Sequence, residues 1–212
     1  MLSEDLERAI AEMVAIGEVA PDADPAALED LVVMHARDLE GLETLTSLRT
    51  LSLIGCSAGD YRRVGRLPSL RLLAIEHSDL VSLDGVLPVG VQVVVVRNCR
   101  LSSVAPADVP TGLQVIDVSG NPLDDAAAAV VDDGVLRGAV VTRDDDRVLA
   151  LNARLARADG AFVCAGAADA CILTVSGLDI TPHPERVHVS TTTAEVDIAL
   201  STGALRALAG IE

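Results

Sequence analysis

A short motif recurs at a nearly constant interval through the first half of the chain. Its clearest copy, LQVIDVSGNPL, begins at Leu113. The earlier copies are LEDLVVMHARDL, LRTLSLIGCSA, LRLLAIEHSDL and VQVVVVRNCRL, and the five copies begin at residues 28, 48, 70, 91 and 113. The intervals are therefore 20, 22, 21 and 22 residues. Units this short cannot bury an apolar face alone, so the period predicts similar units stacked on one shared core.

Each copy carries apolar residues at its first, fourth and sixth positions. Alternate residues of a strand point to the same face, so positions 4 and 6 predict the inward side of a short parallel strand. These pairs are Leu31 and Val33, Leu51 and Leu53, Leu73 and Ile75, Val94 and Val96, and Ile116 and Val118.

The ninth position of each copy holds a small side chain, in the order Ala36, Cys56, Ser78, Cys99 and Asn121. The chain leaves the strand there, away from water, where backbone groups need hydrogen-bond partners. We expect these side chains to be buried, and all except Ala36 to be able to supply such bonds.

This pattern resembles the leucine-rich repeat family, whose motif is L-x-x-L-x-L-x-x-N/C-x-L. The resemblance covers about residues 28–123 and departs from the motif at Ala36, Asp38, Ala58 and Ser78. It implies an α/β-type, right-handed solenoid with a parallel β-sheet on its concave face, used to bind other proteins. We expect three parts: a helical cap over residues 1–27, the repeats over 28–123, and divergent repeats with a C-terminal cap over 124–212.

The first residues predict a helix that covers the open end of the stack. Ser3 can cap this helix, acidic residues fill its first turn, and Leu6, Ile10 and Met13 or Val14 follow helical spacing. The segment PDADP then ends the helix.

Beyond Leu123 the motif degrades. LRGAVVTRDDD, from Leu136, predicts a sixth and irregular repeat, and RVLALNARLARA fits either a strand or a helix. CILTVSGLDI and RVHVSTTTAEVDIAL predict strands, the second from alternation at Val187/Val189 and Val196/Ile198/Leu200, and GALRALAGI predicts a closing helix. We favour divergent repeats that end in a cap over a small, separate β-rich cap.

The composition excludes some classes of function. The formal net charge is −16 and all sixteen basic residues are Arg, so the chain lacks the basic surface that nucleic acid requires. The acidity permits a basic protein partner. No segment approaches the roughly 20 apolar residues of a membrane span, and the N-terminus lacks the basic region of a signal peptide. We therefore expect no membrane association and a cytoplasmic protein with reduced cysteines.

Neither the cysteines nor the histidines form a recognisable site in the sequence. Cys56 and Cys99 lie two repeats apart, which at about 4.8 Å per strand exceeds the reach of a disulfide. His35 and His77 share the eighth position two repeats apart, too far for one metal ion. The six residues between Cys164 and Cys171 are not a zinc spacing.

No catalytic motif is evident either. The acidic runs at 124–125, 132–133 and 144–146 lack the spacing of a calcium loop and predict solvated turns. We expect no cofactor, no metal and no catalytic residue. The alternative is an enzyme whose site lies in the C-terminal third, around His183, Glu185 and His188.

The third, fifth and seventh positions of each copy form the outer face of the predicted sheet. This face is mostly apolar, and an exposed apolar face indicates a partner. We expect Met34, Ile54, Leu72, Val93 and Val95 to act as apolar anchors, and Glu76, Arg97 and Asp117 to set the register of the complex. An immunity-type or regulatory protein with a basic partner is one concrete form. A homodimer, or the C-terminal segment folded over the face, is the alternative.

Overall fold

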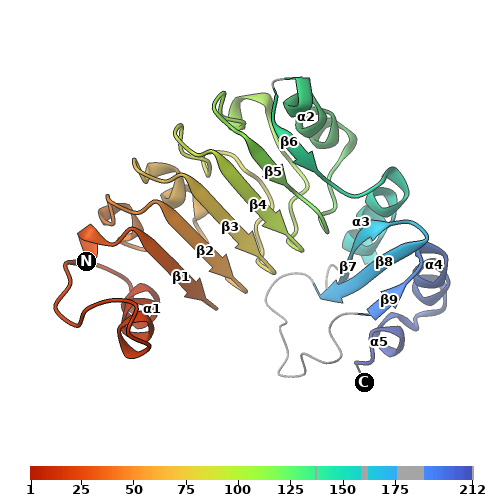
Figure 1. Ribbon diagram of the computed structural model, residues 1–212. Helices are drawn as coiled ribbons and strands as arrows, with labels where there is room; N and C mark the ends of the chain where they lie inside the picture. Colours follow the sequence, from red (N-terminus) through yellow and green to blue (C-terminus); the bar gives the residue numbers. More distant parts are fainter. Residues whose placement is uncertain (137, 159–161, 176–188, 212) are drawn as a thin grey trace.

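The computed structural model describes residues 1–136, 138–158, 162–175 and 189–211 (Figure 1). Its main feature is a six-stranded parallel sheet whose strands follow each other in chain order. The strands are β1 (Asp30–Met34), β2 (Thr50–Ile54), β3 (Leu72–Glu76), β4 (Val93–Arg97), β5 (Val115–Asp117) and β6 (Val140–Thr142). Each repeat thus adds one strand beside the previous one, as the sequence period predicts.

The register of the sheet confirms the alignment of the five copies. Their third residues, Asp30, Thr50, Leu72, Val93 and Val115, are paired from strand to strand. The side chains at positions 4 and 6 are all 0 or 1% exposed in every copy. The inward face of the sheet therefore holds the apolar pairs that the motif places there.

Short 3-10 helices lie before β1 and in the connections between repeat strands. They are η1 (Pro25–Ala27), η2 (Leu42–Thr44), η3 (Tyr61–Arg66) and η4 (Pro106–Asp108). Buried Leu42, Val64 and Leu67 from these segments pack in the same aliphatic core as the strand residues. Tyr61 is the aromatic residue of this core, and its hydroxyl donates to Asp79 or to the carbonyl of Cys56, each at 2.8 Å.

Helix α1 (Glu4–Ala15) contacts β1 at the end of the stack where we expect the N-terminal cap. The Ser3 hydroxyl accepts the N–H of Leu6 and caps the helix, as predicted. Ala9 is buried between Leu6 and Met13, whereas Ile10 is only partly buried. Ile10 also packs against the core, so the predicted stripe is confirmed and Ala9 is added to it.

A sixth repeat is present, with a shifted register. Strand β6 follows helix α2 (Asp125–Leu136), and Val140 pairs with Val115. The predicted start at Leu136 would have placed Gly138 opposite Val115, so the repeat begins two residues later than expected.

The chain after β6 forms a separate unit. It comprises α3 (Asp146–Ala158), β7 (Phe162–Ala167), β8 (Ala170–Val175), β9 (Val189–Thr191), α4 (Thr193–Thr202) and α5 (Leu205–Leu208). The three strands make an antiparallel sheet in the order β7-β8-β9. Our preference for further divergent repeats is therefore wrong beyond β6, since an antiparallel sheet cannot continue the parallel stack.

The predicted strand through Val196 and Ile198 is also wrong. Thr192 and Glu195 form a capping box that starts helix α4. Val196 and Ile198 therefore lie in a helix and not in a strand. Val196 is buried while Ile198 is 64% exposed, so the alternation does not mark one face of a sheet. Val187, the first residue of that pattern, lies outside the described residues. No described helix is long and apolar enough to cross a membrane.

Candidate protein-binding surface

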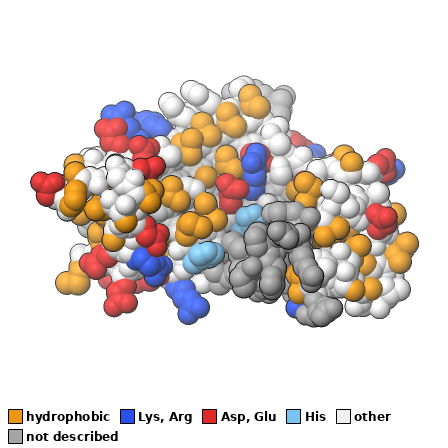
Figure 2. Space-filling model, turned by 60° about the horizontal axis from the view of Figure 1, so that its bottom comes forward, with side chains coloured by type: hydrophobic (Ala, Val, Ile, Leu, Met, Phe, Trp, Pro, Cys, Tyr) orange, Lys and Arg blue, Asp and Glu red, His pale blue; other side chains and the backbone are white. Residues whose placement is uncertain are grey.

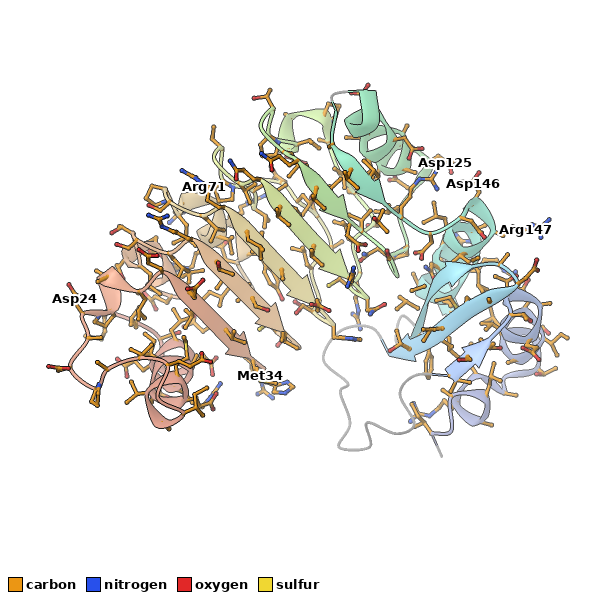
Figure 3. All side chains as sticks on the ribbon, in the orientation of Figure 1. Asp24, Met34, Arg71, Asp125, Asp146 and Arg147 are labelled. Carbon is orange, nitrogen blue, oxygen red and sulfur yellow. The ribbon has the colours of Figure 1, made fainter. Side chains whose placement is uncertain are left out.

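The outer face of the six-stranded sheet presents apolar side chains to solvent. Met34, at the end of β1 (Figure 3), is 46% exposed, and Val32 is 45% exposed. Ile54, Leu72, Val93 and Val95 are partly exposed on the following strands. Figure 2 shows hydrophobic side chains gathered in the middle of one side of the molecule, with charged groups around them. We call the apolar residues Val32, Met34, Ile54, Leu72, Val93 and Val95 the sheet face.

Charged residues border the sheet face on β3, β4 and β5. Glu76 is partly exposed and pairs across the sheet with Arg97, which is exposed. Arg97 Nε donates to Asp117 Oδ2 at 2.8 Å, from the neighbouring strand. The guanidinium is therefore held in place beside the apolar residues.

The side chain of Asp117 is buried, contrary to the expectation that it faces a partner. The residue is 5% exposed, and its second oxygen accepts the hydroxyl of Ser119 at 2.6 Å and the N–H of Ser119 at 3.1 Å. Burial opposes ionisation, but the hydrogen bonds from Arg97 and Ser119 keep the pKa of Asp117 below its usual value. Asp117 thus anchors Arg97 and is covered by it.

The eighth position of every copy adopts a left-handed backbone. The φ angles are 56° at His35, 62° at Gly55, 50° at His77, 52° at Asn98 and 70° at Gly120. Glycine, asparagine and histidine are the residues that tolerate this conformation best. His35 and His77 therefore lie in the turns that follow β1 and β3. His77 Nε2 lies 3.5 Å from Asn98 Nδ2.

The ninth position forms a buried ladder of polar side chains, as predicted. Asn121 Nδ2 donates to the carbonyl of Val96 in the previous repeat at 2.7 Å. The thiols of Cys56 and Cys99 donate to the carbonyls of Val33 and Ile75 one repeat back, at 3.7 and 3.5 Å. Burial raises the pKa of the Cys99 thiol to about 12, so the thiol stays protonated and unreactive. Cys56, Cys99, Cys164 and Cys171 are all free and buried.

The acidic run at 144–146 is solvated at Asp145 and Asp146 but buried at Asp144. Asp144 is 2% exposed, and its carboxylate accepts the backbone N–H of Gly120 at 2.6 Å and that of Gly166 at 2.8 Å. Asp145 accepts the N–H of Val148 at the start of α3 and that of Ala168 at 2.6 Å. Asp144 therefore connects the repeats to the C-terminal unit and Asp145 holds contacts within that unit, so the predicted solvated turn is wrong for Asp144.

Asn152 on α3 is a buried polar residue that sequence reasoning missed. Its amide oxygen accepts the N–H of Cys164 at 2.7 Å and its amide nitrogen donates to the Cys164 carbonyl at 2.8 Å. Together with Asp144 and Asp145, Asn152 accepts the N–H groups of residues 164, 166 and 168 along one edge of β7. This edge of the C-terminal sheet is therefore closed by side chains.

Other acids of the acidic runs take part in a helix cap and in ion pairs. Across residues 1–136, 138–158, 162–175 and 189–211, no three His, Cys, Asp or Glu side chains are grouped to hold a metal ion. Asp124 caps α2 by accepting the N–H of Ala127, and Asp132 and Asp146 bind Arg143. His183, Glu185 and His188 lie outside the described residues.

Comparisons with known proteins give one distant likeness. No protein-family model matches the chain, and no curated protein matches it. An internalin from Listeria monocytogenes has a similar structure, with a TM-score of 0.45 and 19% sequence identity, over 68% of this chain and 52% of the internalin chain. The chain thus spans about half the length of that protein, and the likeness is too low to carry an argument on family or function.

Proposed function

We propose that this protein is a non-catalytic recognition module that binds a protein partner through the sheet face. The observation that carries the proposal is the run of partly exposed apolar side chains over four adjacent strands, from Met34 on β1 to Val95 on β4. A continuous apolar surface of this kind is characteristic of an interaction site. The repeated motif and the parallel sheet further support a leucine-rich repeat protein with the right-handed solenoid of that family.

The sheet face is held rigidly before any partner arrives. The alternate side chains of the same strands are fully buried, and the ladder of Cys56, Ser78, Cys99 and Asn121 ties each repeat to the one before it. A surface that does not need to be ordered on binding loses less entropy in the complex. Met34, Ile54, Leu72, Val93 and Val95 would then supply most of the affinity.

The charges favour a basic partner. The chain carries a net charge of −16, and Asp30 and Glu76 border the sheet face without an ion pair to a described residue. Arg97 is neutralised by Asp117, so the local charge of the face is negative. Acidic surfaces accelerate encounter with basic proteins and select against acidic ones. An intracellular immunity-type or regulatory protein would fit these properties, and the four free cysteines are in keeping with a reducing cytoplasm.

The test uses a matched pair of charge insertions. Val93→Glu/Val95→Glu places two carboxylates on the sheet face, whereas Val89→Glu changes a residue that is 92% exposed and outside that face. A photo-crosslinking residue at position 72, on the sheet face and unchanged in both variants, identifies the protein that contacts the face in a lysate of the source organism. We expect the double variant to lose this partner and Val89→Glu to retain it, with both variants folded.

Two other functions give different results in the same experiments. A self-associating scaffold would elute as a dimer in light scattering, and Val93→Glu/Val95→Glu would convert it to a monomer. An enzyme with a site in the C-terminal third would turn over a substrate regardless of changes to the sheet face. Retention of a crosslinked partner by the double variant would contradict the proposed surface.

A further inference from the structure

A second candidate site lies between the repeats and the C-terminal unit. A groove of about 400 Å³ is bounded on one side by the loops that follow β3, β4 and β5, and on the other by α3 and the start of β7. Figure 1 shows α3 and β7 next to the ends of the repeat strands. This volume falls within the range of small-molecule sites, about 300–1,000 Å³. The groove shares no residue with the sheet face.

The walls of the groove are mainly apolar. Val81, from the loop after β3, is 52% exposed and lines the groove together with Pro122, Ala153 and Ala156. Val81 and Ala153 come from segments far apart in the sequence, which the contacts of Asp144 and Asn152 hold together. Asn152 precedes Ala153 on α3 and donates to the Asn121 carbonyl, next to Pro122. The groove is therefore a fixed part of the junction.

Two arginines lie on this apolar groove. Arg100 and Arg157 both line it, and neither takes part in an ion pair or a side-chain hydrogen bond with any residue that the structure describes. By contrast, Arg63, Arg97 and Arg143 each bind a carboxylate. Arg100 and Arg157 therefore leave guanidinium donors available to a ligand in the same groove.

The one acid in the described lining of the groove offsets only one of the two positive charges. Asp124 lines the groove, but its carboxylate accepts the N–H of Ala127 at 2.7 Å and caps α2. Arg100, Arg157 and Asp124 are the charged residues in the described lining, which therefore carries a charge of +1. Salt screens charges beyond about 8 Å, so the charges nearest a bound ligand affect it more than the net charge of the whole chain.

We propose that this groove binds a small organic anion with an apolar body, with its acidic head at Arg100 and Arg157. Guanidinium groups are suited to carboxylates because they offer several N–H donors in one plane. The alanine, valine and proline walls would cover an aliphatic chain of the length of a medium-chain fatty acid. Anion binding in the groove does not depend on protein binding at the sheet face. Either proposal can therefore fail without the other.

The experiment uses octanoate as the anion and 1-octanol as its neutral analogue, each titrated into the ¹⁵N-labelled full-length protein. We expect octanoate to produce saturable amide shifts at Ser102, Ala153 and Val163, with weaker binding of octanol to the same residues. Arg100→Gln/Arg157→Gln should weaken octanoate binding about tenfold or more and leave octanol binding unchanged. Arg147→Gln, on α3 outside the groove, is the control and should change neither.

A second variant tests the apolar wall independently. Ala153→Leu adds volume inside the groove and should weaken both octanoate and octanol, while circular dichroism confirms that the variant folds. The proposal is overturned if octanoate fails to saturate below about 10 mM. It is also overturned if the affected amides lie elsewhere, or if the double glutamine variant binds octanoate as the native chain does.

Discussion

The carboxylate of Asp144 accepts the backbone N–H of Gly166 at 2.8 Å, while its other oxygen accepts that of Gly120 at 2.6 Å. Gly120 lies in the turn after β5 and Gly166 belongs to β7, so one buried side chain connects the two parts of the molecule. Burial raises the pKa of Asp144 to about 6, and the nearby acids Asp117 and Asp145 act in the same direction. The junction is therefore sensitive to pH.

This sensitivity predicts the sign of a stability change. The pKa of Asp144 is near 3.8 in the unfolded chain and about 6 in the folded one, so the folded state binds more protons between these values. The contribution of Asp144 to the free energy of unfolding is then largest below pH 4 and falls by about 3 kcal/mol as the pH rises through 6. Urea unfolding of the native chain and of Asp144→Asn, at pH 4.5 and pH 6.5, measures this contribution.

Asparagine at this position keeps the size of the side chain and does not titrate. We expect the free energy of unfolding of the native chain to fall by about 2 kcal/mol more than that of Asp144→Asn between pH 4.5 and pH 6.5. The other acids remain in both proteins and cancel in this comparison. Equal pH dependence of the two proteins would rule out a raised pKa at Asp144.

The carboxylate of Asp5 connects helix α1 to the turn after β1. Asp5 Oδ2 accepts the N–H of Arg37 at 2.7 Å and that of Asp38 at 3.1 Å, in the turn after β1. Asp5→Ala removes the acceptor for both groups and should lower the free energy of unfolding by about 1–2 kcal/mol. Glu7→Ala, an exposed acid on the same helix, is the control and should change it by less than about 0.5 kcal/mol. Similar losses for the two variants would mean that the contacts of Asp5 do not stabilise the cap.

The repeat fold could be predicted from the sequence because its signal is local and periodic. Leu51 and Leu53 alternate within one strand, and the same alternation returns about 21 residues later in register, so each copy supports the others. The left-handed eighth position also has a signal, since His, Gly, His, Asn and Gly occupy it in turn. We considered His35 and His77 only as possible metal ligands, which lie too far apart for one ion, and so missed this turn.

The C-terminal unit and the buried acids could not be predicted in the same way. Asp144 binds groups 24 and 22 residues away in the chain, and no local pattern marks such a contact. Asp117 lies at an outward position, but the side chain of Arg97 from the neighbouring strand covers it. The capping box of Thr192 and Glu195 is visible in the sequence, yet the apolar alternation after it favoured a strand.

Alanine should destabilise the protein at Gly120, in the left-handed turn after β5, but not at Gly59. Gly120 has a φ of 70°, and a Cβ added there would lie 2.2 Å from Asn98 Oδ1. Gly120→Ala should therefore lower the free energy of unfolding by about 2 kcal/mol, because the strain exceeds the entropy that alanine removes from the unfolded chain. Gly59→Ala meets no atom within 4 Å and should leave stability unchanged or slightly raised. Thermal unfolding of both variants distinguishes a required turn glycine from a tolerated one.

The ion pair between Arg97 and Asp117 should contribute more to the free energy of unfolding than a fully exposed ion pair does. Asp117 is almost wholly covered and also accepts two hydrogen bonds from Ser119, whereas Arg62 and Asp84 form a pair in which both side chains are more than 60% exposed. Double-mutant cycles with alanine should give a coupling of about 1 kcal/mol for Arg97 and Asp117, after allowance for the half-exposed guanidinium. The coupling of Arg62 and Asp84 should be much smaller, since solvent screens both groups. Equal couplings would mean that Asp117 does not hold Arg97 in place beside the sheet face.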